Sequence, residues 1–333
     1  MMNNYKILFI TILFTSTLIS ISSQSFMGIW LGLEINLMSI IPLMNNSKNM
    51  LSTESSIKYF ITQALASTLL LFAIIMMMKN KALITYNADL MINTSMLIKM
   101  GAAPFHFWFP EVMEGLSWIN CLIIMTWQKI APLMVLSYVI SKTFVLMSIL
   151  LSMIVSGLMG LNQTSLRKIM TFSSINHLGW ILSGMITSDT VWLHYFLIYT
   201  LITFSLIIMF NTLKISLFSQ MFSTVNEKNT LKVFLIMNFL SIGGLPPFLG
   251  FLPKWLTIQS LIQENMILLS LVMIMMTLIP LYFYIRITLS SLTNSFNEVN
   301  FLHKTKFNLW MMIVFNSISI MGLIMCTSLF NNL

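Results

Sequence analysis

The chain has 333 residues, of which 57% are hydrophobic and only 8% are charged, with a formal net charge of +8 and a mean hydropathy of +0.89. Soluble domains carry about 25% charged residues, so this composition excludes a water-soluble globular protein and indicates an integral membrane protein. The positive charge does not indicate nucleic-acid binding, because the basic residues stand singly between apolar runs. Two cysteines, Cys121 and Cys326, form no pattern typical of disulfides, a zinc site or an iron–sulfur cluster.

Eleven segments are long and apolar enough to be membrane spans, since a spanning helix needs about 20 mostly apolar residues. The loops between them are short and rich in Asn, Ser, Thr and Lys, and no soluble domain is inserted. We therefore predict an all-α polytopic membrane protein, with a single membrane domain over residues 1–333. The predicted spans cover residues 5–22, 26–44, 57–78, 90–109, 118–140, 143–161, 170–187, 190–213, 231–257, 266–287 and 308–330.

Basic residues are unevenly distributed between the predicted loops. With eleven spans the two termini lie on opposite sides of the membrane. The N-terminal side then receives Lys6, Lys48, Lys58, Arg167, Lys168, Lys214, Lys228, Lys232, Arg286, Lys304 and Lys306, and the opposite side receives Lys79, Lys81 and Lys142. Because Lys and Arg are enriched in loops on the inside of a membrane, we expect the N-terminus on the positive-inside face.

Four charged side chains within the predicted spans are assigned to neither side of the membrane: Glu34, Lys99, Lys129 and Lys254. Isolated and facing lipid, the four would together cost about 10–14 kcal/mol. One lysine can reach the interface with its long side chain, but one carboxylate among three ammoniums near mid-depth indicates a hydrated or paired interior. Burial disfavours a charged lysine and a nearby carboxylate favours it, so a lysine whose partner moves can gain and lose a proton. The pattern predicts a proton relay.

Glycine and proline interrupt the fourth and ninth predicted spans. The residues that break these helices are Gly101, Pro104, Gly243, Gly244, Pro246 and Pro247. Proline removes a backbone donor, and a membrane tolerates such a break only where protein or water satisfies the freed groups. Interrupted helices at corresponding positions of two halves are typical of inverted-repeat transporters. We predict two inverted five-helix repeats, about 5–140 and 143–287, followed by a helix over 308–330; kinks that serve only packing are the alternative.

Three histidines also lie inside predicted spans, and two of them are candidate relay groups. His177 in SSINHLGWI and His106 in APFHFWFP could extend a proton path. A histidine held in place by hydrogen bonds, with no part in proton transfer, is the alternative for each.

Five segments occur in order along the chain: LGLEINLMSIIPL, LIKMGAAPFHFWFPEV, TWQKIAPL, SSINHLGW and GGLPPFLGFLPKW. They resemble the chain 2 family of mitochondrial NADH–ubiquinone oxidoreductase (respiratory complex I) in its insect form, over essentially the whole chain. The resemblance implies an antiporter-like, proton-pumping subunit of the membrane arm, with eleven helices where bacterial relatives have fourteen. It also implies that the family's key glutamate and three lysines fall on Glu34, Lys99, Lys129 and Lys254.

The resemblance further implies location and partners. The chain would lie in the mitochondrial inner membrane, with its N-terminus in the matrix and its C-terminus in the intermembrane space. Its partners would be other membrane-arm subunits of complex I, including the antiporter-like chain 4 and small connecting subunits, and lipids such as cardiolipin.

The sequence carries no GxGxxG loop and no cysteine cluster. We therefore expect no cofactor in this chain, with NADH, FMN, iron–sulfur clusters and ubiquinone held by other subunits and the NADH:ubiquinone reductase activity belonging to the assembly. Two alternatives use the same residues differently: a free-standing cation/proton antiporter of the same fold, and a structural membrane scaffold in which the charges are vestigial.

Overall fold

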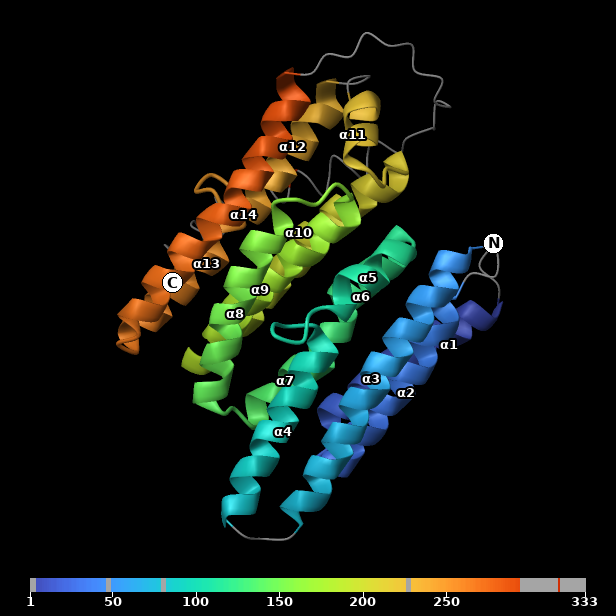
Figure 1. Cartoon of the computed structure of the whole chain (residues 1–333), viewed down its shortest axis with the longest axis vertical. Coiled ribbons are helices and arrows are strands. Elements are labelled where there is room, and N and C mark those ends of the chain that lie inside the picture. The colour runs from blue at the N-terminus through green and yellow to red at the C-terminus, as the bar shows by residue number, and fades with distance from the viewer. Residues whose placement is uncertain (1–3, 46–48, 79–81, 226–228, 294–316, 318–333) are drawn as a thin grey trace. The chain divides into compact units, whose positions relative to one another are not determined.

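The computed structural model describes residues 4–45, 49–78, 82–225, 229–293 and 317 (Figure 1). Within these ranges the regular structure is helical, apart from one isolated backbone bridge, which confirms the all-α prediction. The chain divides into two compact units, Met1–Ser148 and Ile149–Leu333. The predicted helix over residues 308–330 lies, except for Ser317, outside the described residues.

The helices of the first unit carry polar and apolar residues in mixed order, and their hydroxyl groups bond to backbone carbonyls within the same helix. Ser16, for example, donates to the Leu13 carbonyl at 2.9 Å, so a buried hydroxyl costs little in an apolar setting. The elements are α1 (Asn4–Ser22), α2 (Phe26–Met44), α3 (Met50–Met77), α4 (Ala82–Met100), α5 (Trp108–Gly115), α6 (Trp118–Met125), α7 (Trp127–Tyr138) and the start of α8 (Lys142–Gly160).

Small residues allow α1 and α2 to pack closely. A Cβ added to Gly32 on α2 would lie 2.8 Å from the backbone nitrogen of Ser20 on α1, and small residues at such contacts are typical of helices that associate in membranes. The Trp30 indole of α2 then donates to the Ser67 carbonyl of α3 at 3.2 Å. These contacts hold the first three helices together and place Glu34 on the helix between them.

The second unit is built around α9. Its elements are the rest of α8, α9 (Leu166–Thr187), α10 (Asp189–Leu213), α11 (Phe218–Val225), α12 (Asn229–Gly243), α13 (Phe251–Gln263) and α14 (Ile267–Thr293). Helix α9 packs against α10, α13 and α14 and is buried along almost its whole length. Protein therefore surrounds its polar side chains, and the Asn176 amide, for example, donates to the Ser156 hydroxyl at 3.2 Å.

Seven helical segments of the described chain are long and apolar enough to cross a membrane: Tyr5–Ser22, Phe26–Met44, Met50–Met77, Trp118–Tyr138, Lys142–Gly160, Asp189–Leu213 and Ile267–Ser290. They coincide with the first, second, third, fifth, sixth, eighth and tenth predicted spans. The chain is thus a multi-pass membrane protein. Breaks divide the fourth and ninth predicted spans into shorter helices, and the seventh corresponds to α9, whose polar residues lower its hydropathy.

The structure differs from the sequence prediction in the fifth span, which was expected to be continuous. Thr126 separates α6 from α7, with φ −115° and ψ −71°, and its hydroxyl donates to the Leu122 carbonyl at 2.7 Å. Neither glycine nor proline stands at position 126, so no helix-breaking residue indicates the division. As a result, Lys129 lies in the first turn of a new helix.

Candidate functional site

The break in the fourth span is a tight helix end. Gly101 has a φ of 71°, a left-handed conformation that favours glycine. Its N–H donates to the Ile98 carbonyl and the Ala102 N–H donates to the Leu97 carbonyl, both at 3.1 Å. This pair of bonds is the Schellman motif, so α4 ends here with its last carbonyls partly satisfied by its own backbone.

The break in the ninth span ends α12 in the same way. Gly244 has a φ of 77°, its N–H donates to the Ser241 carbonyl at 3.0 Å, and the Leu245 N–H donates to the Leu240 carbonyl at 3.3 Å. A left-handed glycine and two crossing backbone bonds therefore close both helices.

The two breaks continue with matching turns. The Phe105 N–H donates to the Ala102 carbonyl at 2.9 Å, and the Phe248 N–H donates to the Leu245 carbonyl at 3.0 Å. The sequences GAAPFHFWFPE and GLPPFLGFLPK share Gly, Pro, Phe and Pro at the same offsets from the first residue. In this register the last letters are Glu111 and Lys254, so corresponding positions carry opposite charges.

Lys254 lies in the first turn of α13 and reaches back to the end of α12. Its ammonium donates a hydrogen bond to the Gly243 carbonyl oxygen at 2.8 Å. The C-terminal end of a helix carries partial negative charge and favours a cation, so the broken helix provides a site for this one. Gly244 leaves room for it, because an added Cβ would lie 2.8 Å from the Lys254 Nζ.

Lys99 lies in the last turn of α4, where the helix end likewise favours a cation. Its side chain is buried, with 7% of the residue exposed. It lines a cavity of about 10 Å³, close to the least space that one water molecule needs. The other residues that line this cavity are Leu33, Asn36, Leu37, Tyr59, Gln63, Gln128 and Pro132.

Uncharged polar side chains join three helices around this cavity. The Gln128 amide of α7 donates to the Asn36 side-chain oxygen of α2 at 2.9 Å, and the Tyr59 hydroxyl of α3 donates to the Gln128 side-chain oxygen at 3.5 Å. The Gln63 amide donates to the Lys99 carbonyl at 3.4 Å. Sequence reasoning missed these residues; the available signal was the presence of amides within apolar spans, near Glu34 and Lys129.

Glu34 is half-buried on α2, and its charge is close enough to Lys99 to act on it electrostatically. The two do not form a direct ion pair: the ion pairs of the described residues join Lys58 to Glu54 and to Glu111, each at 2.9 Å. The carboxylate and the ammonium therefore interact through intervening space or water.

Lys129 is almost completely buried on α7, with 1% of the residue exposed. Its Nζ lies 5.4 Å from the centre of the Phe109 ring, within the range in which an aromatic face attracts a cation. Phe109 belongs to α5, directly after the break. Glu34, Lys99 and Lys129 thus belong to the first unit, around the broken fourth span, and Lys254 belongs to the second unit.

The two candidate histidines have different settings. His177 Nδ1 lies 2.8 Å from the Tyr195 hydroxyl in the buried interior of the second unit. His106 Nδ1 lies 3.3 Å from the Pro104 carbonyl oxygen, and its ring contacts Phe107 at 4.3 Å between centres. His106 therefore contributes to the packing of the turn, whereas His177 belongs to a buried cluster with Tyr195.

Residues 23–280 match the family described as NADH:quinone oxidoreductase/Mrp antiporter, TM. The chain is 51% identical over 331 residues to NADH-ubiquinone oxidoreductase chain 2 of Anopheles gambiae, with 97% of each chain covered. The chain belongs to the NADH-ubiquinone oxidoreductase chain 2 family. It is also 50% identical over 331 residues to the chain 2 of Aedes aegypti, again with 97% of each covered. These matches confirm the family resemblance that the five sequence segments indicated.

Solved structures show that this chain 2 family member has the antiporter-like fold. A chain of respiratory complex I from Thermus thermophilus with bound aureothin is similar with a TM-score of 0.85 at 19% identity, covering 96% of this chain and 79% of that one. A chain of the Mrp complex from Dietzia sp. DQ12-45-1b is similar with a TM-score of 0.76 at 15% identity, covering 90% of this chain and 62% of that one. At these identities the likeness concerns the fold.

Proposed function

We infer that the chain is a core membrane-arm subunit of respiratory complex I that translocates protons across the mitochondrial inner membrane. The observation that carries this inference is its membership of the chain 2 family over almost its whole length. It acts as part of NADH:ubiquinone oxidoreductase, alongside other membrane-arm subunits. NADH, FMN, iron–sulfur clusters and ubiquinone are held elsewhere in the assembly, and reduction of the quinone supplies the energy.

The proton path in this chain runs through Glu34, Lys99, Lys129 and Lys254. Each lysine has an environment that can hold its charge inside a membrane: the ends of broken helices for Lys99 and Lys254, and an aromatic face for Lys129. Glu34 and Lys99 interact without a direct ion pair. The strength of this electrostatic interaction can therefore change when either group gains or loses a proton. Lys129 passes protons toward Lys254, which exchanges with the far side. His177 is a further relay group, and His106 is a weaker candidate.

The architecture that supports this path is eleven membrane helices, ten of which form two inverted five-helix repeats. The matching turns after Gly101 and Gly244 support corresponding roles for the two broken helices. An odd number of helices in each repeat makes the second run through the membrane in the opposite sense to the first. In this proposal the charged groups of both repeats serve the same proton path.

The excess of basic residues on one side supports an orientation with the N-terminus in the matrix and the C-terminus in the intermembrane space. The neighbouring subunits include the antiporter-like chain 4 and small connecting membrane subunits. Lipids such as cardiolipin contact the chain in the membrane.

Replacing Lys129 by Met in the assembled complex tests this function. The variant keeps an apolar stem of similar length but has no proton to transfer, so we expect normal assembly and fewer protons pumped per NADH oxidised. Lys142→Met is the matched control, because Lys142 is exposed at the start of α8. Pumping would be measured as acidification per NADH oxidised in sealed membrane vesicles.

The Lys129→Met experiment tests the scaffold alternative, and transport by the purified chain tests the antiporter alternative. A structural scaffold predicts unchanged pumping by Lys129→Met. A free-standing antiporter predicts that the purified chain alone exchanges sodium or potassium for protons without NADH.

A further inference from the structure

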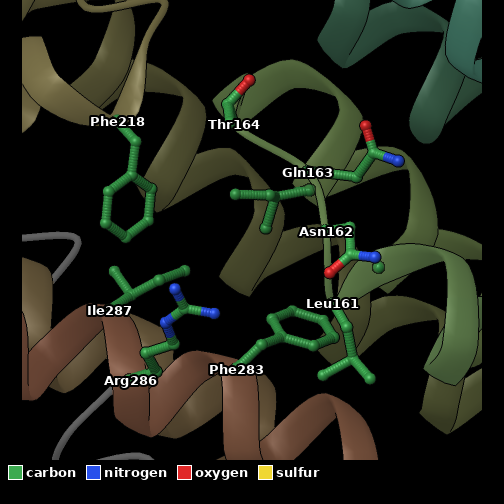
Figure 2. Close-up of a pocket in the computed structure, with 10 residues that line it drawn as sticks. Leu161, Asn162, Gln163, Thr164, Phe218, Phe283, Arg286 and Ile287 are labelled. Atoms are coloured by element: carbon green, nitrogen blue, oxygen red, sulfur yellow. The ribbon is translucent and has the colours of Figure 1, made fainter.

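A cavity of about 450 Å³ lies at one end of the second unit, within the size range of small-ligand sites. Figure 2 shows the Arg286 guanidinium pointing into it from α14, with the Asn162 amide facing it from the α8–α9 loop. Phe218, Phe283 and Ile287 provide apolar walls. The cavity therefore combines one cation, the polar side chains of Asn162, Gln163 and Thr164, and an apolar lining.

Three candidate membrane spans end at this cavity. Span Lys142–Gly160 ends directly before Leu161 and Asn162, span Asp189–Leu213 ends a few residues before Phe218, and Arg286 lies in the last part of span Ile267–Ser290. The apolar walls thus belong to the spans and the polar groups to their ends. This places the cavity at the level where acyl chains meet lipid headgroups.

Positive charge is concentrated at this end of the unit. Arg167 and Lys168 occupy the first turn of α9, directly after the cavity-lining loop. Cations at a helix N-terminus are unfavourable because the helix dipole is positive there, and a bound anion offsets this. The acids described in this unit, Asp189 and Glu264, follow the far ends of α9 and α13.

The rim of the cavity is held by backbone pairing. Ser165 and Leu217 form an antiparallel bridge, in which the Phe218 N–H donates to the Thr164 carbonyl at 3.1 Å and the Leu166 N–H donates to the Ser216 carbonyl at 3.0 Å. The loop that carries Asn162 is therefore fixed against the segment that carries Phe218, and a ligand would meet a formed site.

We propose that this cavity binds the phosphate headgroup of an anionic phospholipid. Arginine presents a planar fork of donors that matches a phosphate, and the apolar walls accept the upper part of the acyl chains. Basic pockets between membrane helices on the matrix side are known to suit such headgroups. Only the choice of the matrix leaflet rests on the orientation proposed above; the chemistry of the site does not depend on proton pumping.

A second cavity provides an internal comparison. It has the same volume of about 450 Å³ and lies in the first unit, lined by Ile21, Ser22, Ser23, Gln24, Phe26, Ile29 and Tyr138. None of these residues is charged. It offers lipid a space of similar size without a cation, so contact there should not depend on the charge of the headgroup.

Photolabelling of the assembled complex tests the proposal. The complex would be reconstituted into phosphatidylcholine nanodiscs that contain a photoreactive cardiolipin or a photoreactive phosphatidylcholine, and labelled peptides would be located by mass spectrometry. We expect cardiolipin to label residues 161–164 and 283–287 more strongly than phosphatidylcholine does, and residues 21–29 equally with both probes. Arg286→Gln should reduce the cardiolipin label about fivefold, the effect typical of one basic side chain at an anionic membrane surface.

Lys214→Gln is the matched control, since Lys214 is an exposed cation that follows α10 and does not line the cavity. Cardiolipin labelling of the Lys214→Gln variant should equal that of the unmodified complex. Arg286→Lys should retain most of the cardiolipin label because it keeps the positive charge. Equal labelling by the two lipids, no loss in Arg286→Gln, or absence of label because another subunit fills the cavity would each overturn the proposal. So would loss of the label in excess inorganic phosphate, which would identify a free-phosphate site. Proton pumping, measured on the same samples, reports separately on the proposed function.

Discussion

The Lys254 ammonium donates a 2.8 Å hydrogen bond to the carbonyl oxygen of Gly243, the last residue of α12. The bond joins the two halves of a broken helix, and it uses a carbonyl that an unbroken helix would have paired internally. The break therefore does more than bend the chain, because it creates a place for a cation inside a membrane span. A kink that served only packing would need neither the lysine nor the glycine beside it.

We expect Gly244→Ala to destabilise the break and displace the lysine. The backbone at Gly244 is left-handed, which costs an L-residue roughly 1–2 kcal/mol, and the new Cβ would lie 2.8 Å from the Lys254 Nζ. Gly243→Ala is the matched control, because its added Cβ would lie at an ordinary 3.6 Å from Tyr284. The Gly244 variant should lower both the melting temperature of the complex and the protons pumped per NADH. Equal behaviour of the two alanine variants would refute this account of the glycine.

Lys254 and Glu111 occupy matching positions after the two breaks, yet we expect them to differ in importance. Lys254→Met should lower proton pumping without loss of assembly, because it removes the cation at the helix end. Glu111→Gln should change pumping little, because Glu111 pairs with Lys58 where both side chains are exposed, at 57% and 42%, and exposed ion pairs contribute about 0–1 kcal/mol. A strong pumping defect in Glu111→Gln would show that the first repeat uses this carboxylate.

The bond between Gln128 and Asn36 should appear as coupling in a double-mutant cycle. Gln128→Leu leaves the buried Asn36 side chain without that donor, and an unsatisfied buried polar group costs about 1–3 kcal/mol. Asn36→Leu and Gln128→Leu together remove both partners, so the double variant should be less destabilised than the sum of the single variants. Thermal denaturation of the complex measures this. Strict additivity would mean that the two side chains do not depend on each other.

Tyr195→Phe distinguishes a relay histidine from a structural one. The change removes the hydroxyl that lies 2.8 Å from His177 Nδ1 and keeps the ring. If His177 carries protons, pumping falls while the complex stays assembled, because the hydroxyl orients the imidazole. Tyr138→Phe, at an exposed tyrosine, controls for loss of a hydroxyl. A change in melting temperature with normal pumping would favour the structural role.

The sequence predicted those features of the site that are costly in a membrane. Charges at Lys99 and Lys254 stand out because hydrocarbon disfavours them, and glycine with proline marked both breaks. The pairing of Asn36 with Gln128 could not be predicted, because it depends on which faces of α2 and α7 meet, and neither residue is charged. The division between α6 and α7 at Thr126 could not be predicted either, because no helix-breaking residue stands there.

The most direct test of the account is a density map of the assembled complex that resolves ordered water around Glu34 and Lys99. Proton transfer between groups that form no direct ion pair needs an intervening donor and acceptor, and the cavity beside Lys99 has space for about one water molecule. The account predicts ordered water between the carboxylate and the ammonium, with further waters approaching Lys129. A dry, apolar surrounding at these side chains, or contact with acyl chains, would contradict it.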